Sequence, residues 1–531
     1  MWAPVPIYFR KRYRGVFVSF GQWIAELDNL VWGPWLLGLL LGTGVYLSIR
    51  LRWLPVRRLK RALGYAVGVE EGGRGNEGVG RNRAGNGGRA EEVPVKGRRE
   101  ADGTVRGGRK AGRRKAGRVS SFSSLTTELA ATIGTGNIVG VATAMVLGGP
   151  GALFWMVLTS VIGMATKLVE STLAVKYRGR NRAGQVAGGP MYVMELAFPN
   201  RRIGHILAVA FAFFAVLASF GMGNMVQANS ISDALAVTFQ VPKAECGLVL
   251  TIVTVLVVLG GISVIGKVTQ VMVPFMGIFY LLGTLAVILF HWKNVPLAVG
   301  GIFSAAFCPE AVSGGLFGQV VVSTFDSLRW GVSRGIFSNE AGLGASGISA
   351  AAADTEDPVR QGYVSMTGVF LDTIVICSAT GLALAASGAL GAVDEKGVPL
   401  TGTALTLAAF ETVLGKFGGQ FIGICIVLFA FATIVAWAYQ GERAFEFLMR
   451  GRTKYNLWYR FAYGLAAFVG CLCPLEAVWN FSDICNGLMA VPNLICVLTL
   501  SRVVCGDIVA HDGMRGGMSG RGETGVELRR G

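Results

Sequence analysis

The sequence predicts an all-α integral membrane protein with about eleven transmembrane helices. Of its 531 residues, 52% are hydrophobic and only 15% are charged, and the mean hydropathy of +0.53 exceeds that of a soluble protein of this size. Apolar stretches of about 20 residues, the length that crosses a bilayer, recur along the chain. Two of them contain glycine-rich interruptions, which a membrane helix tolerates only where the freed backbone groups are buried in protein or line a cavity.

The candidate spans follow one another from residue 32 to residue 500. They are 32–49, 125–147, 154–175, 206–229, 248–265, 268–290, 317–337, 362–387, 421–438, 461–475 and 478–500. We expect a short segment over 1–29, a membrane domain over 30–504 and a tail over 505–531. The first apolar stretch starts late and lacks a following small-residue cleavage site, so we expect no cleavable signal peptide.

The net charge of +17 collects in loops beside the spans and is not evidence of nucleic-acid binding. Basic groups occupy 50–61, 176–180, 450–460 and 515–530. Basic loops stay cytoplasmic. With eleven spans, all four groups are cytoplasmic if the N-terminus lies outside and the C-terminus inside. The basic run at 10–14 violates the rule in this orientation.

Residues 68–118 form a low-complexity loop rich in glycine and arginine. Such a composition cannot bury a core, so we expect a disordered cytoplasmic linker. A polybasic loop can also contact anionic membrane lipid. Interleaved aromatic residues are absent from the loop, so its sequence gives no support for nucleic-acid binding.

The nine cysteines and three histidines show no spacing typical of metal ligands, and we expect neither a metal centre nor a resident cofactor. The cysteines lie mostly within spans, where they serve as small apolar residues.

The first interruption lies in the second span, at Gly134-Thr135-Gly136-Asn137. Each glycine costs a helix interior about 1 kcal/mol relative to alanine, and interrupted spans in transporters mark binding sites. The alternative is close helix packing through Gly136 and Gly140, which have the GxxxG spacing.

The second interruption lies in the seventh span, within 330–347, where five glycines surround Arg334 and Glu340. Because five spans separate the two interruptions, the halves that contain them enter the membrane in opposite directions. We therefore expect two inverted repeats, at about 121–290 and 317–500, with the first span as an addition.

Several long motifs resemble the alanine or glycine:cation symporter family. They include TIGTGNIVGVATA, GGPGALFWM, ASFGMGNMVQANSI, SRGIFSNEAGLG and WNFSDICNGLMAVPNLI. The resemblance covers about 30–504. It implies a leucine-transporter-like fold with two inverted five-helix repeats, and uptake of an amino acid with sodium or protons across the inner (plasma) membrane of a prokaryotic cell.

A zwitterionic substrate needs a site for each of its charges. Backbone N–H groups at the start of a half-helix suit the carboxylate, and Gly136 and Asn137 fit this role, with the Thr135 hydroxyl beside them. For the ammonium we expect carbonyls at the second interruption, around Trp330 and Gly331, and the amide oxygen of Gln227. The alternative role of Gln227 is a hydrogen bond between helices.

By similarity to leucine-transporter-like proteins, the resemblance implies a sodium site. Its ligands would be the carbonyls of Ala130 and Ile133, together with Ala430 and Thr433 of the ninth span. Thr433 can instead hydrogen-bond within its own helix, which is common for membrane threonines.

Acidic residues inside a membrane are functional by default. The candidates here are Glu128, Asp326, Asp372 and Asp483. They can also be neutralised by nearby bases. We expect such pairing between Asp326 and Arg329 and between Arg334 and Glu340.

The sequence therefore predicts a monomeric secondary symporter for alanine or glycine, coupled to sodium or protons by alternating access. A channel would need a symmetric pore and a repeated filter, and an enzyme would need converging catalytic groups. The sequence supports neither.

Overall fold

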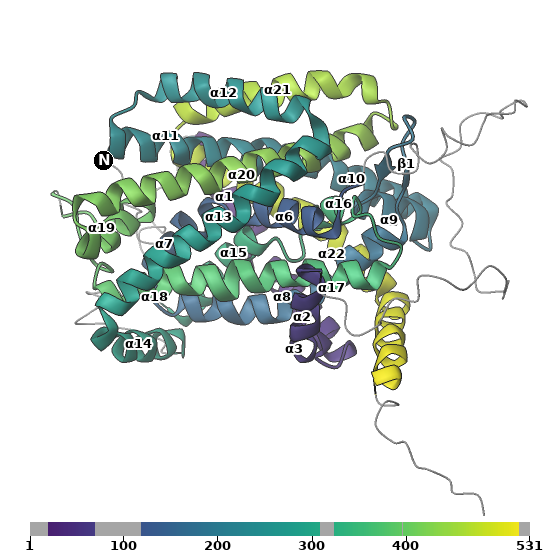
Figure 1. The fold of residues 1–531 in the computed structure, drawn as a ribbon, viewed down its shortest axis with the longest axis horizontal. Helices are drawn as coiled ribbons and strands as arrows, with labels where there is room; N and C mark the ends of the chain where they lie inside the picture. Colours follow the sequence, from purple (N-terminus) through teal and green to yellow (C-terminus); the bar gives the residue numbers. More distant parts are fainter. Residues whose placement is uncertain (1–19, 69–117, 308–322, 396, 520–531) are drawn as a thin grey trace, which may run out of the picture.

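The computed structural model describes residues 20–68, 118–307, 323–395 and 397–519 and is built almost wholly of helices (Figure 1). In these ranges, seven helices are long and apolar enough to cross a membrane: Trp23–Arg50, Ala152–Lys176, Arg201–Phe239, Gly261–Phe290, Pro358–Ser387, Lys416–Leu448 and Val478–Gly513. The other predicted spans are shorter or interrupted, so the structure does not confirm the count of eleven. Nearly all of the glycine–arginine loop, residues 69–117, lies outside the described residues.

The N-terminal part is helical from residue 20, earlier than the predicted start of the membrane domain. The elements are α1 (Phe20–Val31), α2 (Pro34–Arg50), α3 (Leu54–Arg57) and α4 (Leu59–Ala66). Pro34 and Pro55 each occupy the first turn of a helix, where the missing N–H of proline has no intrahelical partner to lose.

The next part of the chain contains two irregular helices. The first is divided into α6 (Ser121–Thr132) and α7 (Val139–Leu147) by a 3-10 turn, η2 (Thr135–Asn137). The second passes from α10 (Arg201–Phe220) through a π-helical turn, η3 (Gly221–Met225), into α11 (Val226–Phe239). The other elements are α8 (Ala152–Lys176), β1 (Gly179–Arg180), β2 (Val186–Ala187), α9 (Pro190–Ala197), α12 (Lys243–Leu259), α13 (Gly261–Phe290), η4 (Trp292–Asn294) and α14 (Val295–Phe307).

The C-terminal part repeats this mixture of regular and interrupted helices. Its elements are α15 (Thr324–Asn339), α16 (Ala345–Ala350), α17 (Pro358–Val369), the π-helix η6 (Phe370–Cys377), α18 (Ser378–Ser387), α19 (Gly402–Leu414), α20 (Lys416–Leu448), η7 (Thr453–Tyr455), α21 (Asn456–Leu472) and α22 (Leu475–Ser519). Helix α22 continues well past residue 504, and its yellow end projects from the other helices in Figure 1. The predicted tail therefore begins as a continuation of this helix.

Two boundaries differ from the prediction for local reasons. The fifth and sixth candidate spans meet at Gly260 and Gly261, because α12 ends at Leu259 and Gly261 adopts φ +64°, a conformation that glycine reaches without strain. The sequence analysis also missed α14 and α19, which are 13 residues long each and too short to be counted as spans.

The interrupted helices lie inside the bundle. Helix α6 packs against α13, α16, α17 and α20, and α8 packs against α15 and α17. Helices α12 and α21 pack together along one edge of the molecule, and α14 lies at the opposite edge (Figure 1). The centre of the bundle is thus formed by α6, α8, α15, α17 and α20. The exact boundaries of the two inverted repeats remain a prediction.

Candidate functional site

The first interruption is a true break in the helix, as the sequence predicts. Helix α6 ends at Thr132 and α7 begins at Val139. The Asn137 side chain stabilises the break, because its Oδ1 accepts a hydrogen bond of 2.9 Å from the Gly134 N–H. A Cβ on Gly134 would lie 2.5 Å from Thr433 Oγ1, so only glycine fits. A Cβ on Gly140 would lie 4.0 Å from its nearest neighbour, so tight GxxxG packing does not explain that glycine.

The second interruption lies later than predicted. Helix α15 runs unbroken to Asn339, and the break covers 340–344. Within it Gly342 and Gly344 have φ of +95° and +81°, and Glu340 has φ +56°, which is rare for a residue other than glycine.

The prediction that carbonyls of Trp330 and Gly331 lie at this break is wrong, because both residues are inside α15. A Cβ on Gly331 would lie 2.4 Å from the Ala152 carbonyl oxygen, and the Trp330 side chain covers Gly148. These contacts pack α15 closely against α8 and its N-terminal turn, which is the other use of small residues in membrane helices.

The two breaks face each other. A Cβ on Gly136 would lie 3.3 Å from Phe337 Cδ1 and 3.4 Å from Ser338 Cα, at the end of α15. The Asp372 carboxylate joins them: one oxygen accepts from Asn137 Nδ2 at 2.7 Å, and the other accepts from Ser338 Oγ at 2.7 Å. Asp372 lies in the π-helix η6, and π-helical turns often occur at functional sites.

Gln227 reaches the first break from α11. Its Oε1 accepts the Thr135 N–H at 3.2 Å, and its Nε2 donates to the Met222 carbonyl in η3 at 3.0 Å. The hydrogen bond between helices, which was the alternative role of Gln227, is therefore present. Among the described residues, the buried Thr135 hydroxyl has no hydrogen-bond partner, so it is free to bind a ligand.

The predicted sodium ligands lie together between α6 and α20. Thr433 Oγ1 is 2.9 Å from the Ala130 carbonyl oxygen and 3.1 Å from the Phe429 carbonyl oxygen of its own helix. A hydroxyl has one hydrogen and donates to one carbonyl at a time, so both predicted roles of Thr433 remain open. Ile133 is the residue at which α6 ends. Ala430 precedes Thr433 on α20 and is fully buried. A hydroxyl and carbonyls are suitable ligands for a hard cation.

The predicted ion pairs along α15 are wrong. Arg334 pairs with Asp483 of α22, and the two side chains are only 6% and 3% exposed. Arg329 instead donates to Asn29 Oδ1 at 2.5 Å. Ser323 caps the first turn of α15: its Oγ accepts the Asp326 N–H at 3.0 Å and donates to the Asp326 carboxylate at 2.6 Å.

Glu340 bonds to different partners. Its carboxylate accepts from Trp437 Nε1 at 2.7 Å and from Ser346 Oγ at 3.2 Å. Ser346 also accepts from the Lys167 ammonium, which donates to the Asn339 carbonyl at 3.0 Å. Side chains from α8 and α20 therefore hold the second break in place.

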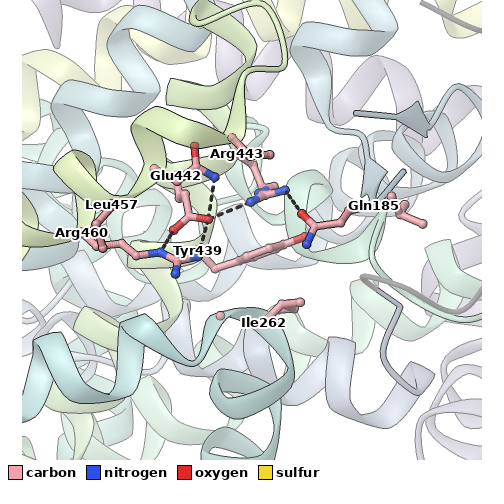
Figure 2. Close-up of a pocket in the computed structure, with 11 residues that line it drawn as sticks. Gln185, Ile262, Tyr439, Glu442, Arg443, Leu457 and Arg460 are labelled. Atoms are coloured by element: carbon pink, nitrogen blue, oxygen red, sulfur yellow. Dashed lines mark hydrogen bonds and ion pairs between the residues drawn. The ribbon is translucent and has the colours of Figure 1, made fainter. Parts of the chain in front are cut away.

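A separate polar region lies at the C-terminal part of α20, beside the basic loops at 176–180 and 450–460. A pocket of about 220 Å³ is lined there by Gln185, Tyr439, Glu442, Arg443 and Arg460, among others (Figure 2). Arg460 belongs to the basic group at 450–460 that is predicted to be cytoplasmic, but its ion-pair partner Glu442 was not predicted from the sequence.

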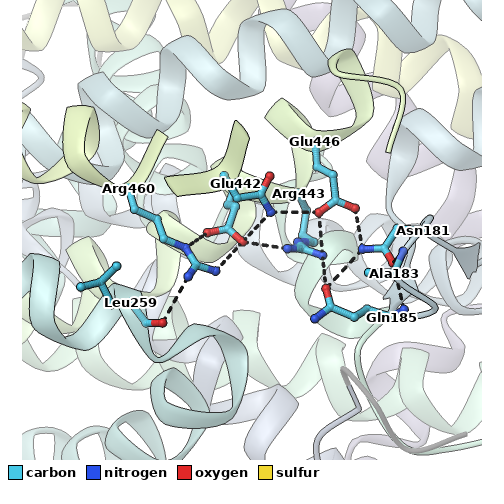
Figure 3. A network of polar contacts seen from close by, with 9 residues as sticks. Asn181, Ala183, Gln185, Leu259, Glu442, Arg443, Glu446 and Arg460 are labelled. Atoms are coloured by element: carbon cyan, nitrogen blue, oxygen red, sulfur yellow. Dashed lines mark hydrogen bonds and ion pairs between the residues drawn. The ribbon is translucent and has the colours of Figure 1, made fainter. Parts of the chain in front are cut away.

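Ion pairs and amide hydrogen bonds connect the charged side chains of this region, which we call the Glu442 network (Glu442, Arg443, Glu446 and Arg460). Glu442 accepts from Arg443 at 2.7 Å and from Arg460 at 2.5 Å. Glu446 lies 3.0 Å from Arg443 and accepts from Asn181 at 2.7 Å (Figure 3).

The sequence is similar to those of sodium symporters for amino acids. Residues 92–515 match the sequence model of the sodium:alanine symporter family. The sodium/alanine symporter AgcS of Methanococcus maripaludis is 44% identical over 94% of this chain and 98% of its own length. The probable sodium/glutamine symporter GlnT of Bacillus subtilis is 34% identical over 90% of this chain and 87% of its own length.

The crystal structure of MhsT in complex with L-phenylalanine superposes with a TM-score of 0.53 at 13% identity, over 72% of this chain and 89% of that one. This similarity shows that the fold is leucine-transporter-like.

Proposed function

The chain belongs to the sodium:alanine symporter family, and from this premise we propose that it imports alanine or glycine with sodium by alternating access. As a member of the family it is a sodium-coupled amino-acid symporter of the plasma membrane, not an enzyme. Our proposal adds the substrate, the mode of access and the orientation, with the N-terminus outside and the C-terminus in the cytoplasm.

The observation that carries the proposal is the contact between the two helix breaks. The start of α7 carries a partial positive charge and the end of α15 a partial negative charge, and Gly136 contacts Phe337 and Ser338 at their junction. These opposite partial charges would suit the two charged ends of a zwitterion. Its carboxylate would bind near Gly136 and Asn137 and the unpartnered Thr135 hydroxyl. Its ammonium would bind the last carbonyls of α15, which have no intrahelical partner, and Gln227 Oε1.

Rigid aromatic side chains favour a small substrate. Phe337 stacks on Trp479 with ring centroids 5.0 Å apart and an interplanar angle of 15°. Trp437 is fully buried, and its indole nitrogen is held by Glu340. Because bulky aromatic rings already pack beside the breaks, we expect a substrate with a small side chain, such as alanine or glycine, rather than one with a longer chain.

Sodium would couple to the substrate through α6. A sodium ion bound by the Ala130 and Ile133 carbonyls, Ala430 and Thr433 would join α6 to α20, and the break that holds the substrate follows directly on α6. A cation that orders this break raises substrate affinity, and the substrate must then raise cation affinity by the same factor.

Uptake into proteoliposomes tests the proposal. Purified protein is given labelled alanine, glycine or glutamine under an inward sodium gradient, an inward proton gradient or no gradient. We expect the sodium gradient to drive accumulation of alanine or glycine, with little glutamine. Accumulation driven by protons in the absence of sodium, or a preference for glutamine, would contradict the proposal.

A further inference from the structure

A buried group of polar side chains lies between α6, α16, α17 and α20. Its centre is Glu128 of α6, which is 1% exposed and whose Oε1 accepts from Ser124 Oγ at 3.3 Å and from Ser365 Oγ at 3.1 Å. Gln361 Nε2 of α17 donates to Ser124 Oγ at 3.3 Å. Ser124 Oγ also lies 3.0 Å from the Ser349 carbonyl oxygen of α16.

Gln440 of α20 completes this group, because its Nε2 donates to Ser349 Oγ at 3.2 Å. We call the six residues the Glu128 cluster: Ser124, Glu128, Ser349, Gln361, Ser365 and Gln440.

Several acceptor oxygens of the cluster are left without a donor. Within the described part of the chain, three of its buried oxygens lack a hydrogen-bond partner: Glu128 Oε2, Gln361 Oε1 and Gln440 Oε1. Leaving a buried acceptor unpaired is costly, and more so when it is charged. A bound cation would satisfy such oxygens.

The charges around Glu128 also favour a cation. The ammonium of Lys167 is the basic group that interacts electrostatically with four described carboxyl groups, those of Glu128, Glu170, Glu340 and Asp372. Its hydrogen bonds go to Asn339 and Ser346 at the second break, not to Glu128. Buried charges need close partners, and Lys167 donates no hydrogen bond to Glu128 among those of the described residues.

The cluster lies next to the proposed sodium site, between the same two helices. Glu128 precedes Ala130 by two residues on α6, and Gln440 follows Thr433 by seven residues on α20, about 10 Å along the helix. The cluster is therefore displaced from the Thr433–Ala130 pair toward the C-terminal end of α20, where the basic loop at 450–460 is predicted to be cytoplasmic.

We propose that the Glu128 cluster binds a second sodium ion, with the Glu128 carboxylate as its charged ligand. The neutral ligands are the hydroxyl oxygens of Ser124 and Ser365, which lie 3.3 Å and 3.1 Å from Glu128 Oε1, since sodium is a hard cation that prefers oxygen. The inference rests on the proposed function only in that sodium is the coupling ion. In the proposed orientation, an ion at this position would lie on the cytoplasmic side of the Thr433 site.

The test is the amount of radioactive sodium that the purified protein binds at saturation. We expect Glu128→Gln to lose about half of the sodium bound at saturation, Thr433→Ala to keep both ions but to bind one of them about tenfold more weakly, and the double variant to show both defects. The sodium that Glu128→Gln retains shows that this variant is folded. Glu195→Gln is the matched control, because Glu195 lies on α9 and pairs with His205, and it should bind as the wild type does.

Ser365→Ala provides an independent test of the second sodium site if Glu128→Gln fails to fold. It removes one neutral ligand, and we expect it to weaken binding of the second ion by roughly tenfold while the first ion binds normally. Loss of all bound sodium in Thr433→Ala, with Glu128→Gln unchanged, would overturn the second site and leave symport intact.

Two other outcomes would contradict either the inference or the proposed function. If a pH indicator shows that substrate binding takes up a proton that Glu128→Gln abolishes, with sodium binding unchanged, the cluster is a proton site and the inference is wrong. If the wild type binds no sodium at all, the proposed function itself fails.

Discussion

Two buried ionic regions of the molecule balance their charges in different ways. In the Glu442 network, two carboxylates face two guanidinium groups, and every carboxylate oxygen accepts a hydrogen bond or an ion pair (Figure 3). Around Lys167, one ammonium faces four described carboxyl groups. The carboxylates of the first region are fully paired within the protein, which fits a structural clamp. In the second region, Glu128 Oε2 and Glu170 Oε2 are buried without a hydrogen-bond partner in the described part of the chain, which fits a region that takes up cations.

The two regions also connect different helices. The Glu442 network joins the end of α20 to the start of α21 and to the chain beside the β1–β2 ribbon, as Figure 3 shows. The region around Lys167 joins both helix breaks through Asp372 and Glu340. Substitutions in the first region should therefore alter stability, and those near the breaks should alter sodium or substrate binding.

The largest effect is expected for Gly134→Ala. Its Cβ would lie 2.5 Å from Thr433 Oγ1 and 3.2 Å from Gln227 Oε1, and overpacking of a buried site costs about 1–3 kcal/mol. Because the methyl group displaces a proposed sodium ligand, we expect sodium-driven alanine uptake to be abolished.

Gly136→Ala is the matched control. Its Cβ would lie 3.3 Å and 3.4 Å from its nearest neighbours, so a small shift accommodates it, and uptake should fall only several-fold. A larger side chain at this position, as in Gly136→Leu, should abolish substrate binding because it fills the space in front of the break. If Gly134→Ala transported normally and Gly136→Ala did not, the proposed position of the sodium ion would be wrong.

Thr433→Ala should have the next largest effect. It removes a hydroxyl that lies 2.9 Å from the Ala130 carbonyl oxygen, and a hydrogen bond or ligand to a charged group contributes roughly 1.5–3 kcal/mol. The sodium concentration for half-maximal uptake should rise about tenfold or more. The maximal rate at saturating sodium should change less, and an unchanged sodium dependence would place the ion elsewhere.

Glu442→Gln should lower stability rather than sodium affinity. Breaking a buried ion pair costs about 3–5 kcal/mol, and the 20% exposure of the Arg460 side chain reduces that cost here. We expect a thermal unfolding midpoint several degrees lower, with the sodium dependence of uptake unchanged.

The double variant Glu442→Gln/Arg460→Gln should recover part of this loss, because it leaves one unpaired guanidinium fewer. A shift in the sodium dependence of Glu442→Gln without loss of stability would show that the Glu442 network takes part in coupling, and the distinction between the two regions would fail.

Local features of the sequence located the first helix break. Two glycines within three residues cannot continue a helix cheaply, so the first break could be located, and the resemblance to a known family placed Thr433 beside Ala130. The second break was harder, because glycines serve two purposes in α15. Gly331 packs against Ala152, whereas Gly342 and Gly344 adopt positive φ, and composition alone does not separate these uses.

The ion pairs could not be predicted from spacing along one helix. Arg334 pairs with Asp483, 149 residues away, and Glu442 pairs with Arg460 across two helices. Such partners depend on which helices pack against each other, and a single sequence does not show how its helices pack. Some of the acids, such as Glu128 and Asp372, were recognisable because a charged residue in an apolar span needs a reason to be there, whereas the buried Glu170, Glu442 and Glu446 were not singled out.

The smallest effect is expected for removal of the glycine–arginine loop. This variant is a control for the comparison of the Glu442 network with the region around Lys167. Both ionic regions lie between residues 119 and 519, so neither should need the loop.

Replacing Gly72–Gly117 with a flexible glycine–serine linker of about twelve residues keeps the chain ends within reach and retains the basic residues at 50–61 that hold the preceding span in its orientation. Uptake per correctly inserted molecule, and its sodium dependence, should match the wild type. If the shortened protein inserts normally but no longer transports, the loop regulates the carrier. The basic residues of the loop would then have to be counted among the charges that act on the carboxyl groups around Lys167.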